Sequence, residues 1–164
     1  MTKKNKKPVQ LRASVLDRLI DHEPDRKTES EKNRHQFFTE IKESVRRDLE
    51  TLLNTRFRCL SPPEECKELD VSLVNYGLPD LNVINFTSSL GRDQFCQFVE
   101  DNIRKFEPRF KAVRVMLTDD GKRLDSAIHF RIEATMYADP APEELIFDSL
   151  LEPVTNNVHV VSSI

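Results

Sequence analysis

A change of period divides the chain at residues 106–110. Before Pro108 the apolar residues recur at the spacing of an amphipathic helix, and after it they alternate as in a β-strand. Proline disfavours α geometry at Glu107 and removes a backbone donor, so we expect the helix to end there. Glu107 and Arg109 then lie two apart on extended chain, where side chains point to the same side. The sequence therefore predicts a carboxylate and a guanidinium presented together at a rigid corner. The simpler interpretation is the end of a helix followed by a surface ion pair, which contributes little to the stability of the fold.

Two long helices are predicted ahead of this corner. The first runs from about residue 30 to 57, and Thr28 with Glu31 fits a capping box at its start. The second runs from about residue 88 to 106, with Ser88 or Ser89 as its N-cap. Each carries one apolar stripe that should face a core. The first stripe comprises Phe37, Ile41, Val45, Leu49, Leu52 and Leu53, and the second Phe95, Val99, Ile103 and Phe106.

Four strands are predicted after the corner, at residues 111–117, 128–136, 144–151 and 157–162. Asp119, Asp120 and Gly121 provide a hairpin signal between the first two. Helices followed by a run of hairpin-linked strands indicate an α+β fold. We expect the two long helices to pack on one face of a small, mainly antiparallel sheet of about four strands. Because the last strand lies near the end of the chain, it should leave a free sheet edge.

A turn motif lies between the two helices. Residues 71–76 can form one helical turn, and Gly77 is suited to end it in a left-handed conformation. Tyr76 should anchor the turn on the core while its hydroxyl stays at the rim. The motif that we interpret as structural comprises Asn75, Tyr76, Gly77, Leu78 and Pro79.

The start of the chain differs from the rest. Residues 1–10 are rich in lysine, and residues 24–32 are highly charged and are predicted to be a linker. Between them, residues 11–21 form a short amphipathic segment that is too short to be a stable helix alone. It could fold onto its own domain or dock on a partner. We therefore predict a flexible segment over 1–33 with a docking helix, and one α+β domain over 34–164.

Composition excludes several functions. The net charge is -3 with a pI of about 5.9, which argues against general nucleic-acid binding. No apolar run reaches the length of a membrane span, and no signal peptide is predicted. The three cysteines have no metal-like spacing and indicate reduced thiols in the cytosol. Four scattered histidines and only three glycines predict neither a metal site nor a phosphate loop, and no cofactor is expected.

Glu107 beside Arg109 favours an ionised carboxylate, which is wrong for a general acid. We expect no catalytic residue and no enzyme.

Four stretches together resemble one family. They read SVLDRL at 14–19, SVRRDLE with LLNTR at 44–56, SLVNYGLPD at 72–80, and FEPR at 106–109. In this order and spacing the chain is similar to TssE, the type VI secretion baseplate protein related to a small wedge protein of contractile phage tails. The resemblance implies a structural part that joins the wedge and provides a start point for sheath polymerisation, by addition of a β-strand to the sheet edge.

The resemblance also implies partners and a location. The expected partners are the wedge proteins TssF and TssG and the sheath proteins TssB and TssC, with TssK as a further candidate. The expected place is the bacterial cytoplasm, in a baseplate at the inner face of the inner membrane, without insertion into it. Two alternatives stay open, a lysozyme-like peptidoglycan hydrolase and a free regulatory adaptor. The residues expected to contact partners are Glu107, Pro108, Arg109, Leu16, Asp17, Arg18 and Leu19.

Overall fold

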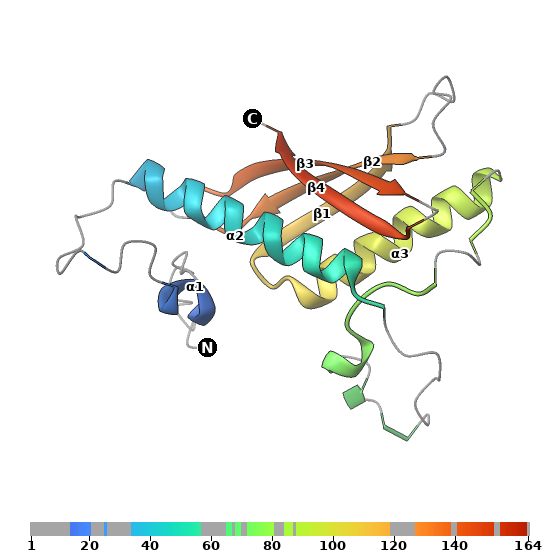
Figure 1. Cartoon of the computed structure of the whole chain (residues 1–164), viewed down its shortest axis with the longest axis horizontal. Helices are drawn as coiled ribbons and strands as arrows, with labels where there is room; N and C mark the ends of the chain where they lie inside the picture. The colour runs from blue at the N-terminus through green and yellow to red at the C-terminus, as the bar shows by residue number, and fades with distance from the viewer. Residues whose placement is uncertain are drawn as a thin grey trace, which may run out of the picture.

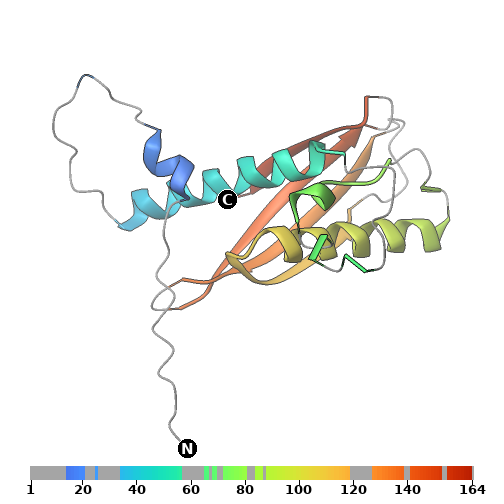
Figure 2. The ribbon, with the colours of Figure 1, turned by 90° about the horizontal axis from the view of Figure 1, so that it is seen from below.

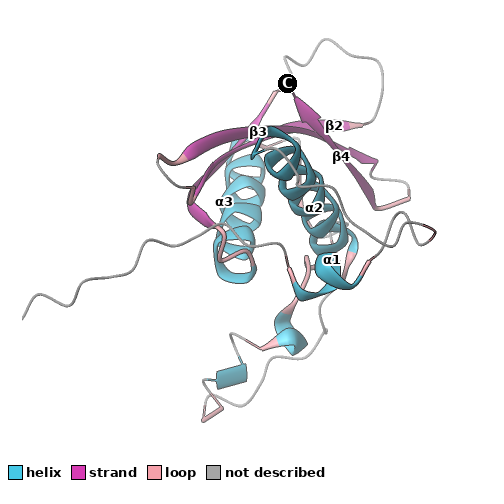
Figure 3. Cartoon of the chain, turned by 90° about the vertical axis from the view of Figure 1, so that its left-hand side faces the viewer, coloured by secondary structure: helices cyan, strands magenta, loops and turns pink. Residues whose placement is uncertain are grey.

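Two long helices lie side by side against one face of a four-stranded sheet in the computed structural model of the chain (Figures 1 and 3). This arrangement confirms the predicted α+β class. The structure describes residues 14–20, 25, 34–56, 65–66, 68–69, 72–80, 84–86, 88–118, 127–138, 141–152 and 155–163. The capping pair Thr28 and Glu31, nearly all of the linker, Cys59 and the turn at 119–121 lie outside these residues.

Helix α2 spans Arg34–Asn54 and confirms the first predicted stripe. Its side chains Ile41, Val45, Leu49, Leu52 and Leu53 are buried, and Phe37 packs at the margin of the core. The helix ends three residues earlier than predicted. Tertiary contacts explain the difference, because the Thr55 carbonyl accepts a hydrogen bond from the Leu78 amide at 2.8 Å and Arg56 pairs with Leu78 in an isolated bridge.

Helix α3 spans Ser89–Phe106 with Ser88 as its N-cap, as predicted. The Ser88 hydroxyl accepts from the Gly91 amide at 3.0 Å, which satisfies one donor of the first turn. Glu107 is the C-cap, and its amide bonds to the Ile103 carbonyl at 2.8 Å. Pro108 therefore ends the helix where the sequence predicted.

The sheet is an antiparallel meander in the order β1-β2-β3-β4. Its strands span Phe110–Leu117, Ile128–Met136, Glu143–Glu152 and Asn157–Ser163. Strand β2 shows the expected alternation, since Phe130, Ile132, Ala134 and Met136 are buried and the residues between them are partly exposed. Helix α2 packs against β4 and α3 against β1, so the core lies between the helices and one face of the sheet.

The turn motif adopts the predicted conformation. A 3-10 turn, η2, spans Leu73–Asn75, and Gly77 follows with a φ of 111°. Leu78 is fully buried beside the end of α2. A Cβ on Gly77 would collide with the carbonyl oxygen of Thr55. Glycine is therefore required here for two reasons, a positive φ and a close approach of two backbones.

Backbone groups of both edge strands form hydrogen bonds with side chains from the helices. On β1, the Val115 amide bonds to a carboxylate oxygen of Glu100 in α3 at 3.4 Å. On β4, both backbone groups of Val158 bond to the side-chain amide of Asn54. The prediction of a free edge at the last strand is therefore wrong at Val158, although β4 is an edge strand as expected.

Candidate partner-binding site

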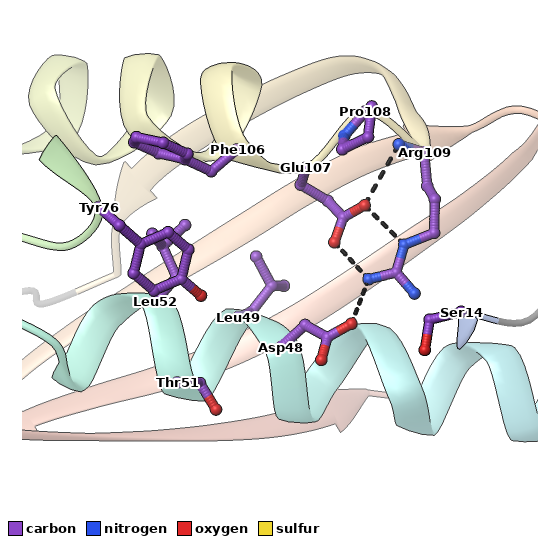
Figure 4. A pocket seen from close by; sticks show the side chains of 10 residues that line it. All are labelled: Ser14, Asp48, Leu49, Thr51, Leu52, Tyr76, Phe106, Glu107, Pro108 and Arg109. Carbon is purple, nitrogen blue, oxygen red and sulfur yellow. Dashed lines mark hydrogen bonds and ion pairs between the residues drawn. The ribbon is translucent and has the colours of Figure 1, made fainter. Parts of the chain in front are cut away.

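The corner at Glu107–Arg109 is a turn and not the extended chain that the sequence predicted. Glu107 has φ -117° and ψ 84°, and the Phe110 amide reaches back to its carbonyl at 3.3 Å. The two side chains meet nonetheless. The Arg109 Nε–H donates to Glu107 Oε1 at 2.6 Å, a second guanidinium N–H donates to Oε2, and the Arg109 amide donates to Oε1 at 3.2 Å (Figure 4).

Burial separates this pair from an ordinary surface ion pair. Glu107 is only 6% exposed, and the side chain of Arg109 is 20% exposed. A buried carboxylate needs a partner that neutralises it and fills its lone pairs. Both oxygens of Glu107 accept from Arg109, so the carboxylate is held within the chain.

Arg109 also reaches across to α2. It donates to Asp48 at 2.5 Å and to the hydroxyl of Ser44 at 3.3 Å. Burial works against the charge of Arg109, but the hydrogen bonds and negative charges of Glu107 and Asp48 raise its pKa. The guanidinium therefore ties the end of α3 and the start of β1 to the middle of α2.

The N-terminal segment joins the same cluster. Helix α1 spans Val15–Leu19, shorter than the predicted 11–21, and lies beside α2 (Figure 2). Ser14 and Asp17 form a reciprocal capping box. Asp17 then accepts from the Ser44 hydroxyl at 2.5 Å and from the guanidinium of Arg47. Among the described side chains, the carboxylate of Asp17 thus holds the helix on α2.

The apolar side chains of α1 point away from this attachment. Val15 is 73% exposed, Leu16 61% and Leu19 76%. A helix of five residues has no stability of its own, so an attachment through a polar residue leaves its apolar side chains available for another surface. The side chain of Arg18 lies outside the described residues.

A groove with a volume of about 390 Å³ opens between α2, the corner, Tyr76 and Ser14 at the N-cap of α1 (Figure 4). Tyr76 and Phe106 form one wall, where their rings meet edge to face with centroids 5.2 Å apart. Burial, with the negative charges of Asp48 and Glu107, raises the pKa of Tyr76. The complete lining comprises Ser14, Asp48, Leu49, Thr51, Leu52, Tyr76, Phe106, Glu107, Pro108 and Arg109.

The sequence singled out part of this site. It predicted that Glu107 and Arg109 would meet, and it placed Asp17 on a docking helix. It did not predict that Ser44, Arg47 and Asp48 would join them. A signal was present, because residues at i, i+3 and i+4 share one face of a helix. Three polar residues at that spacing, Ser44, Arg47 and Asp48, mark the face of α2 that holds both α1 and the corner.

Fold and site together define a class of protein. The charged groups of the site bond to one another and hold three elements together, whereas the groove and α1 present apolar surface. That is the arrangement of a small α+β adaptor that acts by binding other proteins.

The family signature described as baseplate wedge protein gp25 matches residues 39–141, and the chain belongs to this family, which includes the TssE baseplate proteins. The family has a structural role in the baseplate and contacts other baseplate proteins. The matched range includes the corner and the turn motif, whereas α1, β3 and β4 lie beyond it. Among curated proteins no relative matches the chain. In the described part of the chain, no helix is both long and apolar enough to cross a membrane.

The attachment of α1 should depend on pH. Partial burial works against ionisation of Asp17, but hydrogen bonds from Ser14, Ser44 and Arg47 outweigh it and hold its pKa at about 2, against 3.8 for an ordinary aspartate. A lowered pKa means that the contribution of Asp17 is present above about pH 4 and is lost as the pH falls towards 2. We expect the NMR shifts of α1 to move over this range before those of α2. In Asp17→Ala, α1 should be detached already at neutral pH, and an α1 that keeps its wild-type shifts would contradict this account.

Proposed function

We propose that this protein is the TssE-type component of a type VI secretion baseplate, which joins the TssF–TssG wedge and provides the start point for the TssB–TssC sheath. One observation carries the proposal. The charged residues of FEPR and SVRRDLE bond to one another, and beside them the chain has a groove and a short helix with exposed apolar side chains. Exposed apolar surface of this kind is suited to a protein partner.

The wedge contact involves the corner and α1 together. Glu107, Pro108 and Arg109 border the groove, and Pro108 is exposed at its rim. Leu16 and Leu19 form a second exposed apolar patch on α1, whose N-cap Ser14 lines the groove. A helix of the wedge core that lies in the groove would bury both patches at once. Two adjacent contacts held in fixed positions retain a partner more firmly than either alone.

Charge favours a basic side chain on that wedge helix. The hydrogen-bonded cluster contains three carboxylates, from Asp17, Asp48 and Glu107, and two guanidinium groups, from Arg47 and Arg109, which leaves one negative charge. Asp48 is the most exposed of the three carboxylates, with 39% of its side chain accessible. A lysine or arginine that approaches Asp48 would complete the cluster.

The sheath contact involves the sheet edge. Strand β4 ends the meander, so an extended arm of a sheath subunit could add to it as a fifth strand. In this role the protein works in the bacterial cytoplasm, within a baseplate at the inner face of the inner membrane. TssK is a further partner in the same assembly.

The wedge contact is tested by making α1 polar. We expect Leu16→Ser with Leu19→Ser to weaken co-purification with TssF and TssG about tenfold or more, because two buried anchors each contribute on the order of 1 kcal/mol. Both side chains are exposed in the isolated chain, so its melting temperature should not change. The measurement is a quantitative pull-down of the full chain against the TssF–TssG complex.

Leu90→Ser is the matched control, since Leu90 on α3 is 66% exposed and lies away from the groove lining. It should bind as wild type does. Equal binding by all three proteins would contradict the contact at α1. If wild type itself never co-purifies with TssF and TssG, the protein is a free adaptor and the proposal fails.

A further inference from the structure

The hydroxyl of Ser44 is bonded both to α1 and to the corner. It donates to Oδ2 of Asp17 in α1 at 2.5 Å, and it accepts from the guanidinium of Arg109 at 3.3 Å. A hydroxyl has one proton to donate and lone pairs with which to accept, so the two bonds form together without competing. Ser44 is only 6% exposed. Its oxygen therefore lies between the two elements that the wedge contact involves.

Other hydroxyls of the same helix bond differently. Thr39 and Thr51 in α2, and Thr55 just beyond its end, each donate to the backbone carbonyl four residues earlier. This bond is a common one for serine and threonine in a helix. Ser44 donates its one proton to the carboxylate of α1 instead. When α1 leaves, the hydroxyl can turn to the carbonyl of Glu40, four residues earlier, as the threonines do.

Ion pairs between the described residues do not connect α1 to the corner directly. Asp17 pairs with Arg47 of α2, whereas Arg109 pairs with Asp48 and Glu107. A change at the corner therefore reaches the attachment of α1 through the hydrogen bonds of Ser44. Coupling of this kind needs a group with two discrete arrangements. The hydroxyl has them, one directed at α1 and one directed at its own helix.

We propose that Ser44 is a positioning residue that couples the attachment of α1 to the closed corner, so that a partner which engages one element favours the other. The inference rests on the proposed wedge contact, which involves both elements. The bond from Arg109 holds and polarises the hydroxyl, which then donates more strongly to Asp17. In turn, a hydroxyl bonded to Asp17 is a better acceptor for Arg109. By linkage, each element stabilises the other by the same factor.

Amide hydrogen exchange of the isolated full chain at neutral pH measures this coupling. The Ile20 amide donates to the Leu16 carbonyl at 3.1 Å, and this bond opens when α1 is released, because so short a helix does not persist alone. Glu107→Leu with Arg109→Met, the apolar corner variant, removes the bond to Ser44 without leaving a buried charge unpaired. We expect it to accelerate exchange of the Ile20 amide roughly threefold. Combined with Ser44→Ala, it should add no further acceleration.

Single variants on α2 separate coupling from simple attachment. Ser44→Ala alone should accelerate exchange of the Ile20 amide about tenfold or more, because a hydrogen bond to a charged group is lost. Thr39→Ala, the matched control, removes a hydroxyl that donates within the helix and should have no effect. Arg47→Ala also weakens the hold on Asp17 but keeps the Ser44 hydroxyl, so the apolar corner should still add its threefold effect. Ser44→Cys keeps the size of the side chain, weakens both bonds, and replaces Ser44→Ala if that variant does not fold.

The outcomes distinguish the coupling from the wedge role. An apolar corner that accelerates exchange of the Ile20 amide equally with and without the Ser44 hydroxyl, or in neither case, would overturn the inference. In a pull-down against TssF–TssG, Ser44→Ala should bind several-fold more weakly than wild type, and Thr39→Ala should bind as wild type does. Equal binding of Ser44→Ala and wild type would overturn the role of the coupling in assembly and leave the wedge role intact. No binding of wild type would instead refute the proposed function, and the exchange of the isolated chain would still decide whether Ser44 couples the two elements.

Discussion

Arg109→Ala is expected to lower the free energy of unfolding of the isolated protein by about 3–5 kcal/mol. The reason is Glu107, a carboxylate only 6% exposed, which would lose the guanidinium that binds both of its oxygens. Ser44 and Asp48 on α2 would lose their link to the corner in the same step. For a chain of this size the melting temperature should fall by on the order of 10 °C. Thermal unfolding followed by circular dichroism measures it.

A double substitution distinguishes the role of Glu107 and Arg109 in stability from their proposed role in binding a partner. Replacing a buried ion pair by apolar residues of similar volume is often neutral or stabilising. We therefore expect Glu107→Leu with Arg109→Met to recover most of the lost stability. Asp48 loses its partner in this variant too, but it is partly exposed and water can solvate it. An Arg109→Ala protein as stable as wild type would contradict the account of Glu107 as a buried charge.

The same double variant tests the wedge contact without the complication of unfolding. If the corner only holds α3, β1 and α2 together, a stable double variant should assemble with TssF and TssG as wild type does. If the charges of Glu107 and Arg109 also contribute to the surface that binds a partner, the double variant should fold but assemble poorly with TssF and TssG. We expect the second result, because Arg109 and Asp48 both line the groove.

Local patterns predicted the elements of this fold well. The apolar alternation of β2 and the stripe from Ile41 to Leu53 on α2 each identify a buried face, and both faces are buried in the structure. Pro108 and Gly77 were equally informative, because each restricts the backbone in a way that depends on few neighbours. Signals of this kind are contained within a short stretch of sequence.

Contacts between distant polar residues could not be predicted in this way. Asp17 and Ser44 are 27 residues apart, and Ser44 and Arg109 are 65 apart. No period in the sequence connects them. Asn54 at the edge of β4 was missed for the same reason, since its partner Val158 is 104 residues away. The end of α2 was misplaced because a backbone contact to Leu78 outweighs the helical preference of residues 55–57.

Gly91 illustrates how a local rule can mislead. Propensity alone says that a glycine in a helix weakens it, so alanine should stabilise α3. In the structure, a Cβ on Gly91 would collide with the carbonyl oxygen of Asn85. The first turn of α3 therefore packs against the segment before it at a distance that only glycine permits. The sequence has no signal for this close approach.

Gly77→Ala is expected to cost on the order of 3 kcal/mol of stability, through two effects that add. Alanine at a φ of 111° is strained by about 1–3 kcal/mol. Its Cβ would also collide with the carbonyl of Thr55, which accepts the hydrogen bond from the Leu78 amide. Backbone must move to relieve this collision, since neither atom belongs to a flexible side chain. The melting temperature and the hydrogen exchange of the Leu78 amide measure the result.

Two comparisons identify which effect dominates. Val74→Ala, in the preceding 3-10 turn, removes methyl groups from a side chain that is 48% exposed and should change stability by less than 1 kcal/mol. Gly77→Asn tolerates positive φ better than alanine but has the same Cβ. If the collision with Thr55 dominates, the asparagine and alanine variants will be destabilised equally. If strain dominates, asparagine will recover part of the loss.

The consequence of Gly77→Ala should extend to the sheet edge. Thr55 follows Asn54 directly, so a shift of the Thr55 carbonyl moves the residue that pairs with Val158. Arg56 is bound between Leu78 and the Asn156 carbonyl and should move with it. We therefore expect Gly77→Ala to accelerate exchange of the Val158 amide more than that of Val115 on the opposite edge. Equal acceleration at both amides would mean that the defect is global and that the turn motif does not position the edge of β4.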